Sequence, residues 1–262
     1  SLVNSDLQRI NEWIMSRGLQ LNISKSKAMI IGSKAHISKI NFNSLSKLTI
    51  SGQNLEYCKT IKNLGVTFDE HLNFQAHNSL KIQKAYGVLN RIKHTKRVIP
   101  SYVKRDIATA LIDPVISYGD VITYGWGVHG TGSDEDRILV ADNDKIRYVY
   151  GLKRYDHITE YRDRSNTLTP EERAKINSVS LIYKHLNGQS PSYLNDLFVI
   201  RNSNTRSNGQ LQVNRPRTTF DMRSFGYSAI LFWNSIPKEI VRLPTISKFK
   251  DSLKEWIRLG RE

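Results

Sequence analysis

The sequence predicts an α+β protein in which a small antiparallel, hairpin-rich β segment is followed by a mainly α-helical remainder. Two observations predict this order. Before residue 70, short apolar runs of strand length alternate with turn residues such as Ser51-Gly52-Gln53. Beyond residue 71, apolar residues recur at helical spacing in one segment after another. With 262 residues, 39% of them hydrophobic and 24% charged, the chain can bury a core of ordinary size.

We expect three segments along the chain. Residues 1–70 form the β-rich piece, residues 71–130 a helical segment, and residues 131–262 a C-terminal helical region with a basic loop at 201–219. In the first piece, Leu7, Ile10 and Ile14 have the spacing of one helix face, and Gly18 ends that helix. Strands are expected at 27–31, 47–50, 55–58 and 64–68.

The remaining elements are expected to be helices. Asn73 can cap a helix that runs to Arg97, with an apolar stripe that includes Ala85 and Leu89. Thr169-Pro170-Glu171-Glu172 is a capping box that opens a helix to about residue 186. Other helices are expected at 101–114, 134–151, 224–233 and 247–259, and a tight connection at 118–130. Trp233, Phe249 and Trp256 are expected in the core.

Charge is the strongest compositional signal. The chain has 39 Lys and Arg against 24 Asp and Glu, a net charge of +15. Residues 71–105 contain no acid and eight lysines or arginines, and residues 201–217 contain four arginines and again no acid. Such segregation indicates a polyanionic partner, whereas a solvated surface is the simpler alternative. Because acids are absent and not merely outnumbered, we favour nucleic acid as the partner.

Several function classes lack a motif. No apolar run reaches 18 residues, so no membrane partner is expected. A single cysteine, Cys58, excludes an internal disulfide and a cysteine-based zinc site. Acids between Asp134 and Asp144 lack the glycine and closing glutamate of a calcium loop. The chain contains no P-loop, Gly-x-Gly-x-x-Gly or Gly-x-Ser-x-Gly motif, so no cofactor or metal is expected.

Two N-terminal stretches resemble one family. LQRINEWIMSRGLQLNISKSKAMIIGS (7–33) resembles the segment after the catalytic Asp-Asp motif in reverse transcriptases of non-LTR retrotransposons, the LINE or jockey type. Asn22, Lys25 and Lys27 match its Leu-x-Leu-Asn-x-x-Lys-Thr-Lys pattern. IKNLGVTFDEHLNFQAHN (61–78) resembles the primer grip and the start of the thumb, with Leu64 and Gly65 in the grip turn. Asn63 stands where the family commonly has Tyr.

Three later stretches resemble the same family in the same order. They are LIDPVISYGDVITYGWG (111–127), LTPEERAKINSVSLIYKHLNGQSPSYL (168–194) and RSFGYSAILFWNSIPKEIVRLPTISKFKDSLKEWI (223–257). The chain is therefore similar to the end of the palm, the primer grip, the thumb and the C-terminal helical region of such an enzyme.

The resemblance implies a role in binding and not in catalysis. The palm aspartates would lie upstream of Ser1, and two-metal phosphoryl transfer requires them. We therefore expect a catalytically inactive, reverse-transcriptase-derived protein, such as a domesticated element, that holds RNA or DNA by its backbone through a thumb-like helix. Tyr86 and Tyr102 could stack on bases, or could pack in the core. The candidate nucleic-acid-binding residues are Lys25, Lys27, Lys81, Lys84, Arg91, Lys93, Lys96, Arg97, Arg215 and Arg217.

Two other functions stay open. The helical region could serve as a protein-interaction scaffold whose basic charge has no role, or the chain could be one half of a split reverse transcriptase. Basic stretches slightly favour the nucleus over the cytoplasm as the intracellular location.

Overall fold

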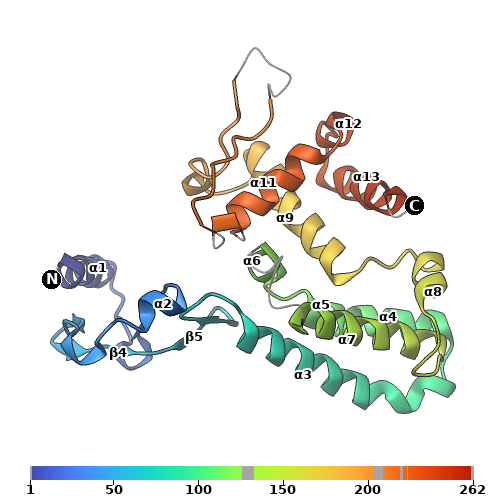
Figure 1. Cartoon of the computed structure of the whole chain (residues 1–262), viewed down its shortest axis with the longest axis horizontal. Coiled ribbons are helices and arrows are strands. Elements are labelled where there is room, and N and C mark those ends of the chain that lie inside the picture. The colour runs from blue at the N-terminus through green and yellow to red at the C-terminus, as the bar shows by residue number, and fades with distance from the viewer. Residues whose placement is uncertain (1, 126–132, 203–208, 219–220, 223, 261–262) are drawn as a thin grey trace. The chain divides into compact units, whose positions relative to one another are not determined.

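The computed structural model describes residues 2–125, 133–202, 209–218, 221–222 and 224–260 (Figure 1). The chain divides into two compact units, Ser1–His77 and Asn78–Glu262. All six named strands lie in the first unit, and helices make up most of the second. The protein is therefore α+β, with the β segment before the helices as the sequence predicts.

Short strands and turns make up most of the first unit after an initial helix. Its elements are α1 (Leu2–Ser16), β1 (Lys27–Ala28), α2 (Lys34–Ile37), β2 (Thr49–Ile50), β3 (Gln53–Asn54), β4 (Glu56–Tyr57), β5 (Thr60–Asn63) and β6 (Val66–Asp69). The pairs β2–β3 and β5–β6 are antiparallel, but β1–β4 is parallel, which differs from the antiparallel expectation. A parallel pair joins segments distant in the sequence, so no local turn signal predicts it.

The β5–β6 hairpin has a two-residue turn made by Leu64 and Gly65. Asn63 pairs with Val66 on either side of it, and the turn residues have φ of 46° and 84°. Positive φ at both positions is the conformation of a type I′ turn, which fits the twist of the flanking strands. The strand expected at 64–68 therefore begins two residues later, and its partner β5 was not predicted.

The second unit is built from helices. They are α3 (Gln75–Ile92, which begins in the first unit), α4 (Ser101–Leu111), α5 (Asp113–Ile116), α6 (Asp120–Gly125), α7 (Ser133–Tyr150), α8 (Thr159–Arg164), α9 (Pro170–Leu186), α11 (Phe225–Ser235), α12 (Lys238–Val241) and α13 (Ile246–Leu259). The capping box at Thr169 and Glu172 is confirmed. The basic helix expected to reach Arg97 is α-helical only to Ile92 and continues as a 3-10 helix over Lys93–Arg97.

Several further differences concern short helices. The connection expected at 118–130 contains α6, while residues 126–130 lie outside the described part of the chain. The helices α2, α5, α8 and α12 were not predicted, because helices of four to six residues are too short to show a full apolar period.

Two apolar clusters form the core of the second unit. One joins α3, α4, α5 and α7, and Ala85, Leu89 and Ile112 are buried in it. Because it also includes Ile138 and Val149, this cluster spans both sides of the predicted boundary at residue 130. The other joins α9, α11 and α13 around Tyr183, Trp233 and Phe249, and Trp256 packs against it. The expected core positions of the tryptophans and Phe249 are confirmed.

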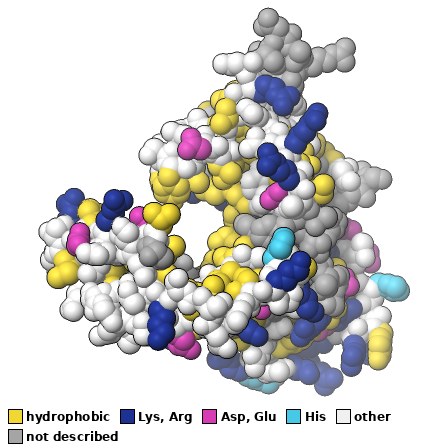
Figure 2. Space-filling view, turned by 60° about the vertical axis from the view of Figure 1, so that its left-hand side comes forward, with side chains coloured by type: hydrophobic (Ala, Val, Ile, Leu, Met, Phe, Trp, Pro, Cys, Tyr) yellow, Lys and Arg dark blue, Asp and Glu magenta, His cyan; other side chains and the backbone are white. Residues whose placement is uncertain are grey.

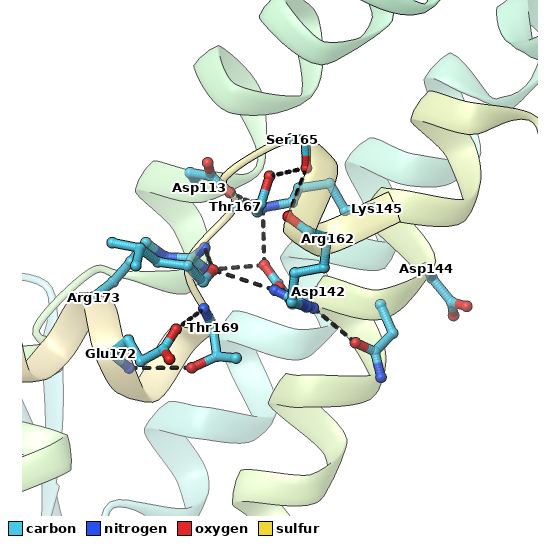
Figure 3. A network of polar contacts seen from close by, with 12 residues as sticks. Asp113, Asp142, Asp144, Lys145, Arg162, Ser165, Thr167, Thr169, Glu172 and Arg173 are labelled. Atoms are coloured by element: carbon cyan, nitrogen blue, oxygen red, sulfur yellow. Dashed lines mark hydrogen bonds and ion pairs between the residues drawn. The ribbon is translucent and has the colours of Figure 1, made fainter. Parts of the chain in front are cut away.

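A buried ion network links four helices of this unit (Figure 3). The Asp142 side chain on α7 is 0% exposed. Its Oδ1 lies 2.9 Å from Lys145 Nζ and 2.9 Å from Arg173 Nη2 on α9, and its Oδ2 lies 2.9 Å from Arg162 Nη2 on α8. Lys145 also pairs with Asp113 on α5 at 2.6 Å. A buried carboxylate of this kind is stable only while its cations stay in place.

Replacing Asp142 by Asn should strongly destabilise the second unit. The change removes the carboxylate charge that pairs with Lys145, Arg162 and Arg173. Asp113 still pairs with Lys145, but both arginines lose this ion pair in a buried environment, which costs about 3–5 kcal/mol of unfolding free energy. Urea unfolding followed by far-UV circular dichroism measures it. The matched control is Glu160→Gln, which breaks the exposed Arg164 pair on α8 and should cost less than about 1 kcal/mol. Equal effects of the two substitutions would contradict the role given to Asp142.

Stability should fall in acid because of the same group. Burial by itself raises the pKa of Asp142, but the charges of Lys145, Arg173 and Arg162 outweigh it and lower the pKa from 3.8 to about 2. A lowered carboxyl pKa stabilises the fold fully above pH 3.8, and this contribution is lost as the pH falls toward 2. The lowered pKa of Asp142 contributes about 2 kcal/mol to the free energy of unfolding at neutral pH. Urea midpoints between pH 5 and 2 test this, and Asp142→Asn should show a shallower fall.

Candidate nucleic-acid interface

A groove lined by basic and aromatic side chains lies between α3 and α7. Its volume is about 690 Å³. Five cations line it, and we call this site the basic groove. They are Lys93, Lys96, Arg147, Lys153 and Arg154. Tyr86, Tyr148 and Tyr155 line it as well, and Asp144 is the one carboxylate among the lining residues that the structure describes.

Two helical stripes and one loop build the basic groove. Tyr86, Leu89, Asn90 and Lys93 follow the i, i+3, i+4, i+7 spacing along α3 and its 3-10 extension. Val140, Asn143, Asp144 and Arg147 repeat the same spacing on α7, so each helix turns one stripe toward the groove.

The loop that completes the groove starts where α7 ends. Gly151 has φ of 74°, and the Leu152 N–H donates to the Arg147 carbonyl oxygen at 2.9 Å. This is the glycine-closed helix end that the sequence predicts at residue 151. The turn brings Lys153, Arg154 and Tyr155 beside the last turn of α7, where the negative end of the helix dipole favours cations.

The acids near the basic groove already have partners. Asp144 accepts hydrogen bonds from Arg147 Nη1 and from the Tyr86 hydroxyl, both at 3.1 Å. Asp156 accepts from the Lys153 backbone N–H at 2.7 Å. Over the described ranges, no carboxylate lies within ion-pair distance of the Lys93, Lys153 or Arg154 side chains. The groove therefore carries a net positive charge.

The three groove tyrosines differ in exposure. Tyr86 is half-buried and donates to Asp144, and burial together with that negative charge raises its pKa. The Tyr148 hydroxyl lies 2.8 Å from Thr95 Oγ1. These two rings form the wall, whereas Tyr155 is 88% exposed. Tyr102, the other candidate for stacking, is 64% exposed on α4 and does not line the groove.

The predicted cations of the α3 region separate into three environments. Lys93 and Lys96 both line the basic groove, and Lys96 Nζ donates to the Leu152 carbonyl oxygen. Lys84 and Arg91 are exposed on another side of α3, and Arg97 is exposed on the 3-10 helix. Figure 2 shows lysine and arginine side chains gathered along the lower edge of the face in view.

Lys81 differs from the surface position expected for it. Its residue is 4% exposed, and its Nζ has no hydrogen-bond partner in the part of the chain that the structure describes. Burial lowers its pKa from 10.5 to about 8, against the opposing charge of Asp120. We therefore leave Lys81 out of the proposed nucleic-acid surface.

The other predicted residues lie outside the groove. Lys25 is exposed at the end of a short 3-10 helix capped by Asn22. Lys27 pairs with Glu56 across β1 and β4, and the hydrogen bond raises its pKa. Leu64 and Gly65 form the exposed β5–β6 turn described above.

The basic loop contributes two further arginines. Arg215 and Arg217 are exposed in the described part of the predicted 201–219 loop. Residues 203–208 and 219 lie outside the described ranges.

Sequence reasoning missed four groove residues: Arg147, Lys153, Arg154 and Tyr155. They lie outside the two acid-free runs, because Asp144 and Asp156 are close to them in the sequence. Two signals were present. The basic-aromatic run Lys153-Arg154-Tyr155 directly follows a helix-ending glycine, and Arg147 lies on a helical stripe with Asn143 and Asp144.

Comparison with protein-family models, curated proteins and solved structures finds no significant match to this chain. Within the described ranges, no group of three His, Cys, Asp or Glu side chains is arranged to hold a metal ion. Nor does any described helix combine the length and apolar character needed to span a bilayer.

Replacing Lys81 by Met should stabilise the protein without weakening nucleic-acid binding. The substitution keeps the apolar stem and removes a buried amine that lacks a hydrogen bond, a gain of about 1–3 kcal/mol at pH 7. The folded state binds the Lys81 proton more weakly than the unfolded state, so the gain should shrink as pH rises from 8 toward 10. Urea unfolding at pH 7 and 9.5 checks this. A loss of stability at pH 7 would show that Lys81 has a required partner.

Proposed function

We propose that this chain is a reverse-transcriptase-derived, nucleic-acid-binding protein that holds a phosphate backbone in the basic groove. The observation that supports it is that one groove is lined by Lys93, Lys96, Arg147, Lys153 and Arg154, while Asp144, the one carboxylate among its described lining residues, is already paired. The order of the five sequence stretches resembling non-LTR reverse transcriptases agrees with such a role. In this proposal the chain binds and positions nucleic acid and does not itself catalyse polymerisation.

Phosphate binding explains why these residue types occur together. Lysine and arginine contact phosphate oxygens without reading bases, so binding is strong at low salt and nearly indifferent to sequence. Asn90 and Asn143 add neutral amide groups that can bond to sugar and phosphate oxygens. Arg91 and Lys84 lie on another side of α3 and add to the long-range electrostatic attraction of a polyanion, which salt screens.

A protein-interaction scaffold is the second candidate, and α1 in the first unit favours it. None of its residues is buried, and Leu2, Trp13 and Met15 are each more than half exposed. Apolar side chains of this size gain free energy when a partner covers them. This role requires no basic groove, so groove substitutions separate the two candidates.

Charge reversal in the groove should weaken binding more than reversal elsewhere. The test pair is Lys93→Glu with Arg154→Glu, and the matched pair is Lys84→Glu with Arg91→Glu, which makes the same change in net charge. We expect the groove pair to lower affinity at least about 10-fold more and to reduce the salt slope by about 2, since two phosphate contacts are lost. Fluorescence anisotropy with RNA, DNA and hybrid duplex between 50 and 200 mM salt measures both.

Unfolding curves of both pairs should overlay that of the unmodified chain, because all four side chains are exposed. If the unmodified chain binds none of these nucleic acids at 50 mM salt, the proposed function is wrong. A stoichiometric protein partner that survives nuclease treatment and both charge reversals would favour the scaffold.

A further inference from the structure

Tyr155 is an exposed aromatic ring at the basic groove. Its residue is 88% exposed, and the Arg154 guanidinium lies over the ring, 5.8 Å from its centroid. A turn over residues 153–156 holds Tyr155 in place, because the Asp156 carboxylate accepts from the Lys153 N–H and the Asp156 N–H donates to the Lys153 carbonyl oxygen. With a cation against the ring and most of its surface open to solvent, a flat ligand can stack on Tyr155.

The groove beside this ring has the size of a small ligand site. Its volume of about 690 Å³ falls in the range that holds molecules such as a nucleotide. Its walls combine apolar rings, through Tyr86 and Tyr148, with the cations defined above. A base with its attached phosphate has the same two parts, one flat and one anionic.

Duplex and single-stranded nucleic acids differ in which of their groups are accessible to such a site. In a duplex the base faces are stacked on one another, so only phosphates and groove edges are available. In a single strand each base has an open face, and aromatic side chains beside basic grooves bind such strands with little sequence preference.

We propose that the basic groove selects single-stranded nucleic acid, with one unpaired base stacked on Tyr155 and its flanking phosphates bound by Arg154, Lys153 and Lys93. This inference rests on the proposed function and adds the class of strand to it. Stacking uses the base face alone, so purine or pyrimidine and RNA or DNA are all accepted.

The experiment compares strands and tyrosine variants in the full chain. Anisotropy titrations use a 12-nucleotide single strand and the matching duplex, each as RNA and as DNA. Tyr155→Ala should lower single-strand affinity about 5- to 150-fold and leave duplex affinity unchanged within twofold. Tyr155→Trp, which keeps an aromatic ring at this position, should retain the single-strand affinity of the unmodified chain. Tyr193→Ala is the matched control, because Tyr193 is 77% exposed and lies outside the groove.

A second readout reports stacking directly. A single strand with one 2-aminopurine should lose fluorescence when the unmodified chain binds, and should keep it with Tyr155→Ala. Equal affinity for duplex and single strand, or an equal loss for both with Tyr155→Ala, overturns the single-strand inference and leaves backbone binding in place. Failure of every nucleic acid to bind overturns both.

Discussion

The carboxylate of Asp142 is fully buried, and its three cations come from α7, α8 and α9. Desolvating one carboxylate and three cations is costly, and the cost is offset only when all of them meet with good geometry. The network therefore fixes how α7 lies against α8 and α9. It also fixes α5 through the Asp113–Lys145 pair. Apolar contacts alone would constrain these helices less, because they tolerate small sliding.

The basic groove depends on this network through α7. Asp142 and Lys145 face the buried network, while Asn143, Asp144 and Arg147 form part of the groove wall. Arg162 joins the two sites, because the Nη2 that approaches Asp142 also donates to Asn143 Oδ1 at 2.8 Å. The orientation of the Asn143 amide is thereby set from inside the protein. A change in the network would move groove residues that it does not touch directly.

Acids of the second unit help to determine where its positive charge is exposed. Asp142 and Asp113 bind cations internally, Asp144 binds Arg147 and Tyr86, and Asp156 binds a backbone N–H. Each of these four carboxylates pairs with a donor group of the protein itself. The net charge of +15 is therefore not spread evenly, and it is concentrated where cations lack a nearby acid. That distribution follows from pairing in three dimensions more than from the order of charges along the chain.

Local chemistry let the sequence alone predict much of this protein. The α+β order, the Thr169 capping box, the glycine end of α7 and the apolar stripes with Ala85, Leu89, Trp233 and Phe249 depend on neighbours within a few residues. The acid-free charge pattern of residues 71–105 also predicted Lys93 and Lys96, which line one side of the groove.

Only the tertiary structure decided the rest, because it depends on contacts between distant segments. The parallel β1–β4 pair, the buried position of Lys81 and the placement of Lys93 in one groove with Arg154 and Tyr155 depend on such contacts, and no local pattern predicts which segments come together. A lysine in an acid-free helix has the same sequence context whether its side chain faces water or a neighbouring helix. Packing determines which of these holds, and the free energy of desolvation then determines whether the lysine carries a charge.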